Sequence, residues 1–241
     1  MDAWKLLETG QPRKAIEAFT RKIRREPTDI HYSSRAEAFI QLKEYDNALA
    51  DLHCANAAAV WTSTHYFERI GVVHWLARRE YLAAATWLES VLAMEGGKIQ
   101  YADAAGGVEP GCLLWFAAVS LGHEELVVPA RRLFESKIAK GKGLLWAVEN
   151  WPGPLAMFLL GSMDEAKVRA QVSDVPILRE RELCQTEFYV AVRALEQGDI
   201  DKATKCYRKA AALHAGSVEN EYDLAQREAR RRDRGRTRRC T

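Results

Sequence analysis

The feature that most constrains the fold of this chain is a short pattern that recurs at the spacing of a helical hairpin. A turn residue is followed by an alanine three to five positions later, and then by an aromatic residue or leucine four positions after that. The clearest copy is Gly198-Asp199 with Ala203 and Tyr207. Three other copies are Gly10 with Ala15 and Phe19, Tyr45 with Ala48 and Leu52, and Tyr81 with Ala84 and Leu88. Copies that recur at the spacing of a helical hairpin predict a stack of similar units.

Packing physics gives each position of the pattern a role. The alanine lets two helices approach closely, and the larger residue one turn later fills the space between neighbouring hairpins. A glycine at the turn tolerates the non-helical backbone between the two helices. One hairpin cannot bury its apolar face alone, so the hairpins must stack. The chain also has only 7 prolines, and these observations together predict an all-α fold.

The alanine-aromatic-alanine spacing, as in Ala203, Tyr207 and Ala210, resembles the motif of the tetratricopeptide repeat (TPR) family. The resemblance covers residues 1–95 and 180–214, and the first copy lacks most of its first helix. It implies an all-α, TPR-like solenoid of helical hairpins with irregular middle helices and a C-terminal capping helix. It also implies a protein-binding scaffold or adaptor, without catalytic activity.

The domain organisation follows from changes in composition along the chain. Residues 1–95 are expected to form the N-terminal TPR-like hairpins, and residues 96–111, rich in glycine, a loop. Residues 112–233 are expected to hold a degenerate repeat, the segment Trp151-Pro152-Gly153-Pro154, the final repeat and the capping helix. Residues 234–241 are expected to be a basic, disordered tail.

The order of motifs after residue 112 is similar to that of bacterial NlpI-like TPR proteins, over residues 113–230. The best-known members of that group are lipoprotein adaptors for cell-wall hydrolases. This chain begins Met1-Asp2-Ala3 without the apolar segment of a signal peptide and without a lipobox cysteine. No stretch approaches 18 apolar residues. The sequence therefore predicts a cytoplasmic protein that does not associate with membranes.

Charge and cysteine usage restrict the function classes further. The last thirteen residues hold seven arginines and one aspartate, whereas the remainder has 28 basic and 32 acidic residues. The five cysteines show no CxxC pair, which disfavours a disulfide framework and a zinc site. Cys184 and Cys206 fall on the two helices of the last repeat, and we interpret them as small core residues rather than as a redox pair or metal site.

Signatures of catalysis are missing from the sequence. We find no nucleophile elbow, P-loop, HExxH motif or dinucleotide-binding glycine motif, and the six histidines are scattered without ligand spacing. The sequence therefore predicts no enzyme, no catalytic residue, no metal and no cofactor.

The predicted partner site is the concave groove, which the first helix of each hairpin lines in TPR proteins. Of the residues expected there, only Arg69 matches the basic and amide residues of the family's clamp for peptide C-termini, so the groove fits an amphipathic helix or an extended peptide better. The alternative is that the chain's own extra helices fill it. The expected groove residues are Ser33, Glu37, Ile40, Gln41, Tyr66, Arg69 and Val73.

The basic tail is a second candidate for binding. It could engage nucleic acid or an acidic partner by counterion release, although no aromatic residue is interleaved for base stacking. Two alternative functions therefore stay open: an RNA-associated factor that uses the tail, and an immunity protein whose mildly acidic body neutralises a bacterial toxin. The basic residues of the tail are Arg230, Arg231, Arg232, Arg234, Arg236, Arg238 and Arg239.

Overall fold

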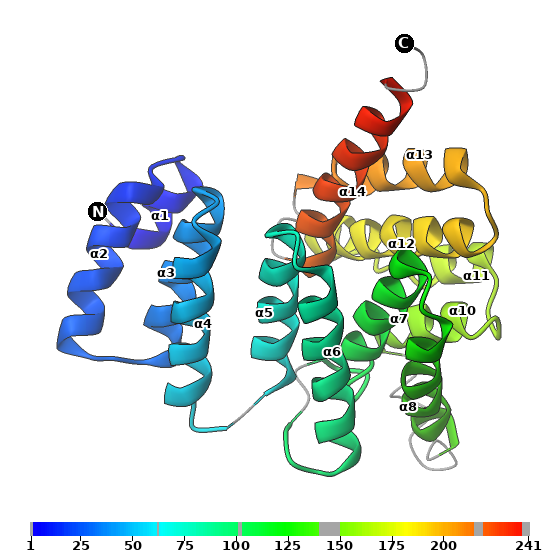
Figure 1. Cartoon of the computed structure of the whole chain (residues 1–241), viewed down its shortest axis with the longest axis horizontal. Coiled ribbons are helices and arrows are strands. Elements are labelled where there is room, and N and C mark those ends of the chain that lie inside the picture. Colours follow the sequence, from blue (N-terminus) through cyan, green and yellow to red (C-terminus); the bar gives the residue numbers. More distant parts are fainter. Residues whose placement is uncertain (1, 62, 101–102, 140–149, 215–218, 238–241) are drawn as a thin grey trace.

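A computed structural model describes residues 2–61, 63–100, 103–139, 150–214 and 219–237 of the chain, with side chains described as far as Arg234. Within these ranges the regular structure is helical, and the single extended feature is an isolated bridge between Ser63 and Gln100. The fold is therefore all-α, as predicted. The helices, coloured along the chain in Figure 1, are α1 (Ala3–Glu8), α2 (Pro12–Arg25), α3 (Asp29–Gln41), α4 (Tyr45–Ala58), α5 (Thr64–Leu76), α6 (Glu80–Glu95), α7 (Glu109–Leu121), α8 (Val127–Ala139), α10 (Gly153–Leu159), α11 (Glu165–Ala170), α12 (Pro176–Glu196), α13 (Ile200–Ala210) and α14 (Asn220–Thr237).

Antiparallel hairpins pair α1 with α2, α3 with α4, α5 with α6, α7 with α8, and α12 with α13. Each hairpin turn has one residue in the left-handed region, which ends the first helix by the usual C-terminal geometry. Glycine supplies this conformation in the last hairpin, at Gly198 with φ of 79°. In the second and third hairpins Lys43 and Arg78 adopt it instead, both with φ of 62°. The common geometry confirms the repeat that the sequence predicts.

The repeated alanines lie in the core, as their proposed role requires. Ala15, Ala48 and Ala203 are fully buried, and Ala84 is nearly so. At these positions a larger side chain would push the two helices of a hairpin apart, since protein interiors are close-packed.

The first hairpins are also joined by a polar contact. Arg35 of α3 donates two hydrogen bonds of 2.7 Å to the carboxylate of Asp51 in α4, and one of 2.9 Å to the hydroxyl of Thr20 in α2. The Asp51 carboxylate and its hydrogen bond raise the pKa of Arg35. One guanidinium group thus connects three consecutive helices.

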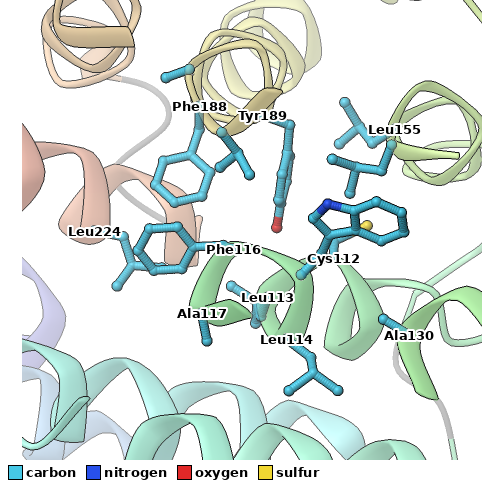
Figure 2. Close-up of a cluster of buried hydrophobic side chains, with 14 of the residues drawn as sticks. Cys112, Leu113, Leu114, Phe116, Ala117, Ala130, Leu155, Phe188, Tyr189 and Leu224 are labelled. Atoms are coloured by element: carbon cyan, nitrogen blue, oxygen red, sulfur yellow. The ribbon is translucent and has the colours of Figure 1, made fainter. Parts of the chain in front are cut away.

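The largest apolar core surrounds α7, which is buried along most of its length (Figure 2). The ring of Phe116 lies 4.6 Å from that of Trp75 in α5 and 4.9 Å from that of Phe188 in α12, measured between centroids. Phe188 in turn contacts Tyr207 of α13 at 5.4 Å. The core thus joins the N-terminal hairpins to the last repeat.

Two segment boundaries differ from those expected. Helix α7 begins at Glu109, inside the expected loop 96–111, because a proline at the second position, Pro110, is well tolerated in a first helical turn. Helix α14 continues to Thr237, so residues 234–237 of the expected disordered tail are helical. Arginine is a good helix former, and this accounts for the extension. Residues 238–241 lie outside the described chain.

Candidate functional site

We name the side of the hairpin stack formed by the first helix of each hairpin the inner face. Helix α14 packs against two of these first helices, α5 and α12, and also against α13, the second helix of the last hairpin (Figure 1). Through its contacts with α5, including the bond between Asp223 and Arg69, the capping helix covers part of the side on which the sequence predicts a groove.

Apart from Arg69, the predicted groove residues fall into two groups in the structure. Ile40 and Val73 lie in the apolar cluster between the second and third hairpins, with exposed fractions of 8% and 0%. Tyr66 is buried as well, and its hydroxyl donates a 2.8 Å hydrogen bond to Asp29 of α3. These three residues hold neighbouring hairpins together and do not line an open surface. Successive side chains on a helix differ in direction by about 100°. An error of one position in the predicted register therefore moves a residue from the groove face to the face that packs on a neighbouring helix.

Arg69 sits at the junction of α3, α5 and α14. Its guanidinium donates bonds of 2.7 and 2.5 Å to the Glu37 carboxylate and one of 2.8 Å to Asp223 of α14. Burial disfavours the charge, but the carboxylates of Glu37 and Asp223 raise the pKa of Arg69 above its ordinary value. Burial raises the pKa of Asp223, and Arg69 opposes that shift. Arg69 is thus a structural tie between the hairpin stack and α14.

The second group remains accessible to a partner. Gln41 is exposed, Ser33 is half-buried, and the Glu37 side chain keeps 31% of its surface in water. Ile30, with 64% exposure, belongs to the same stripe, because positions 30, 33, 37 and 41 share one face of α3. We name these four residues the α3 stripe.

His65, at the start of α5, lies near the α3 stripe. It is exposed, yet its surroundings lower the pKa of the imidazole, first by desolvation and then by the charge of Arg69, against the raising effect of Glu37. The imidazole is therefore neutral at pH 7, and a partner would meet a hydrogen-bonding group there rather than a charge.

Further contacts fix α14 along its length. Glu228, fully buried, accepts a 3.1 Å hydrogen bond from the indole N–H of Trp75. Arg227 pairs with Glu80 of α6, and its guanidinium lies 5.4 Å from the Trp75 ring centre. Arg232 lies 5.3 Å from the ring centre of Tyr207 in α13. Charged and aromatic groups thus supply much of this interface.

The basic residues at the end of the chain fall into different environments. Arg232 has only 13% of its side chain exposed, whereas Arg230, Arg231 and Arg234 are exposed on α14. Arg236 lies on the helical backbone, beyond the described side chains. Arg238 and Arg239 lie outside the described residues.

A group of buried and half-buried carboxyl side chains, which the sequence did not indicate, lies where α14 begins. It comprises Glu68 of α5, Asp103 of the loop before α7, Glu109 of α7 and Glu221 of α14, and we name it the carboxyl cluster. Glu68 and Glu221 have exposed fractions of 1% and 0%. Asp103 accepts hydrogen bonds from the backbone N–H groups of Gly107 (2.8 Å) and Glu109 (3.1 Å).

The side chains at the start of α14 have partners on two helices, α12 and α7. Glu221 accepts hydrogen bonds from the hydroxyl of Tyr189 (2.7 Å) and the amide of Gln185 (3.1 Å). Asn220 donates a 3.0 Å bond to Glu109. One carboxyl oxygen of Glu68, Oε1, has no hydrogen-bond partner among the described residues.

Burial and mutual repulsion shift the titration of the cluster. Burial raises the pKa of Glu68 to about 8, with Asp103 and Glu221 adding to the shift. Burial, followed by the charge of Glu219, raises the pKa of Glu221 to about 7. Burial and then Glu68 raise the pKa of Glu109 well above its ordinary value, and burial raises that of Asp103. The cluster therefore holds protons at neutral pH.

Within the described ranges we find no site arranged for metal binding and no reactive thiol at Cys184 or Cys206. Among these residues, no group of three histidine, cysteine or acidic side chains has an arrangement suited to a metal ion. Cys184 and Cys206 are buried, with their pKa values raised chiefly by burial, and Cys184 donates to the carbonyl of Ala210 at 3.5 Å. Both side chains pack in the core. A buried thiol with a raised pKa is also a poor nucleophile. Among the residues described, we find no helix both long and apolar enough to cross a membrane.

Comparisons with known proteins yield two structures of low sequence identity. No family model and no curated protein matches the chain. A TPR protein from Parabacteroides merdae is 14% identical, with 93% of this chain and 81% of that chain covered and a TM-score of 0.45. The C-terminal part of a TPR repeat-containing protein from Cytophaga hutchinsonii is 16% identical, with 88% and 78% covered and a TM-score of 0.39. Because both scores lie below 0.5, the hairpin assignment rests on the turns and alanines described above. The narrower resemblance to NlpI-like proteins is not confirmed.

Proposed function

We propose that this protein is a non-enzymatic interaction scaffold that binds a segment of another protein along the α3 stripe, beside α14. The observation that carries the proposal is the division of the inner face. Helix α14 covers the α5 part of that face, whereas Ile30, Ser33, Glu37 and Gln41 of α3 keep contact with solvent. Stacked hairpins present such a preorganised face without ordering a loop, which lowers the entropic cost of binding.

The chemistry of the stripe describes the kind of partner that would fit. Ile30 offers one exposed apolar side chain, and Glu37 offers a carboxylate that Arg69 already holds in place. Ser33 and Gln41 supply hydrogen-bonding groups of modest size. A helical or extended segment with an apolar residue to cover Ile30 and a donor facing Glu37 matches this arrangement.

The test begins with capture of partners from the native cell, followed by titration calorimetry with the purified partner. We expect Ile30→Ala to weaken binding by about 1 kcal/mol or more, because it removes the apolar anchor. Ile200→Ala is the matched control: Ile200 is also exposed in the first turn of a helix, α13, but is not on the stripe. Equal affinities of the two variants would contradict the proposed site.

A second candidate function, nucleic-acid binding, is favoured by one specific observation. Arg230, Arg231 and Arg234 are exposed on the end of α14, which projects beyond the hairpins in Figure 1. If they bind phosphate groups, replacing Arg230 and Arg234 by Ala should weaken binding to an RNA oligonucleotide and lower the slope of its salt dependence by about 2. Replacing Arg21 and Arg24, on α2 at the other end of the chain, is the matched control. Unchanged RNA affinity would exclude this role.

A further inference from the structure

The carboxyl cluster attaches the first turn of α14 to α12 and α7, beside the bond of Asp223 to Arg69 of α5. Glu221 is held by Tyr189 and Gln185 of α12, and Asn220 by Glu109 of α7. The indole N–H of Trp151 donates to the other end of the Gln185 amide and so fixes its orientation. Any change in the charge of the cluster therefore acts directly on the attachment of α14.

The composition of the cluster makes that attachment dependent on protons. A carboxylate can only accept hydrogen bonds, whereas a protonated carboxyl can also donate one. With every member ionised, the cluster would bring several negative charges into a buried space. The Oε1 atom of Glu68, fully buried and without a partner among the described residues, is then a costly acceptor without a donor.

The neighbouring groups do not supply enough compensating charge. Asp103 faces Lys137 of α8, which lowers the pKa of that carboxyl but does not offset its burial. Arg181 of α12 is engaged by Glu219, just before α14. Thr64 of α5 donates a hydrogen bond to Glu68, and the remaining neighbour that can ionise on α7, Cys112, is kept neutral by burial.

The rest of α14 is anchored by few apolar groups. Its well-buried apolar side chains are Leu224, Ala225 and Ala229, which remove little apolar surface from water compared with the aromatic core around α7. The other contacts are charged or polar, such as Arg69 with Asp223 and Trp75 with Glu228. An element held in this way has a smaller free energy of local opening than the core helices.

We propose that the carboxyl cluster is a proton-dependent latch: in its protonated form it holds α14 on the inner face of the hairpin stack, and its ionisation lets α14 detach. Detachment uncovers the side of α5 that carries Arg69 and Trp75. The latch thus makes an additional part of the inner face accessible as the pH rises. This inference does not require the α3 stripe to bind a partner.

The direction of the pH effect follows from the raised pKa values of Glu68 and Glu221. The cluster binds protons more tightly in the attached state than in the detached state, where water surrounds Glu221 and reaches its neighbours. Detachment is therefore favoured as the pH rises from the ordinary glutamate value of 4.5 through about 7 and 8. Each unit by which a pKa is raised changes the equilibrium about tenfold once the group ionises. Tyr189 stays neutral throughout, because burial raises its pKa well above 10.0.

The experiment measures hydrogen exchange of the full chain by mass spectrometry at pH 6 and pH 9, corrected for the pH dependence of intrinsic exchange. We expect the protection of α14 to fall about tenfold or more over this range, while that of α4 falls much less. Helix α4 is a suitable internal reference, because its buried contacts are with α3 and α5 and none involves the cluster. An equal fall in both helices would overturn the proposal.

A double variant, Glu68→Gln with Glu221→Gln, tests the cause. The amides approximate the shape of protonated carboxyls and cannot ionise, so the fall in α14 protection between pH 6 and pH 9 should shrink toward that of α4, with Glu109 and Asp103 accounting for what remains. An unchanged fall would also overturn the proposal. If the double variant does not fold, the comparison of α14 with α4 in the wild-type protein still decides between latch and no latch.

Discussion

Arg69 gives the sharpest test of how the inner face is built. The sequence placed it among the groove residues, where its replacement would weaken partner binding. In the structure its guanidinium is bound to Glu37 and to Asp223, residues of α3 and α14, at 2.5 to 2.8 Å. We therefore predict that Arg69→Ala destabilises the folded protein even when no partner is present.

The magnitude follows from what the substitution leaves behind. Removing one member of a buried charge network typically costs about 3–5 kcal/mol, because the remaining charges are left desolvated and unpaired. Here Glu37 and Asp223 keep 31% and 24% of their side-chain surface exposed, so water compensates in part. We expect a loss of about 2–4 kcal/mol in the free energy of unfolding.

The assay is urea unfolding followed by far-UV circular dichroism at pH 7. Arg79→Ala is the matched control, because Arg79 also pairs with a carboxylate, Asp46, but with 39% and 80% of the two side chains exposed. Exposed pairs contribute about 0–1 kcal/mol, so this control should unfold close to the wild type. If Arg69→Ala costs no more than Arg79→Ala, the network around Arg69 does not hold α14 and the reasoning is refuted.

Four further outcomes can be measured in the same way. Gly71→Ala should lower stability by about 1–3 kcal/mol, because its Cβ would lie 2.2 Å from the indole nitrogen of Trp87, whereas Gly96→Ala, with no atom closer than 3.5 Å, should be mild. Ala203→Leu should cost about 1–3 kcal/mol through overpacking, and Lys205→Leu, at an exposed position of the same helix, should not. The free energy of unfolding should fall as the pH rises from about 5 to about 8, since the carboxyl cluster binds more protons in the folded state; a rise would contradict the assigned shifts. Far-UV circular dichroism should show predominantly helix, and a substantial sheet signal would contradict the fold.

The hairpins could be predicted from the sequence because their determinants are local. Gly198 and Asp199 mark a turn, and Ala203 and Tyr207 mark the helix that follows within nine residues. Such contacts depend on neighbours three or four positions apart, which the sequence displays directly. The turns at Lys43 and Arg78 were found only through the alanines beyond them, since neither residue type favours the left-handed region.

The inner face could be predicted only in part, because its determinants are distant in sequence. The bond between Arg69 and Asp223 spans 154 positions, and no local pattern announces it. Ile40 and Val73 were assigned to the groove although they pack between hairpins, since an apolar residue on an amphipathic helix can serve either surface. The carboxyl cluster had no signal at all: Glu68 and Glu221 look in the sequence like ordinary surface glutamates.

The basic run at the end of the chain shows why charge alone is a poor guide to binding. In the sequence its arginines are equivalent, but the helix turns successive positions by about 100° and gives them different surroundings. Arg232 faces Tyr207 and the buried Glu228, where its charge stabilises α14 rather than a partner. Arg230 and Arg234, four positions apart, share an exposed side of α14. An anionic partner would therefore meet these two first, because the exposed Arg231 already pairs with Glu228 at 2.8 Å, and replacing Arg232 should reduce stability before it reduces affinity.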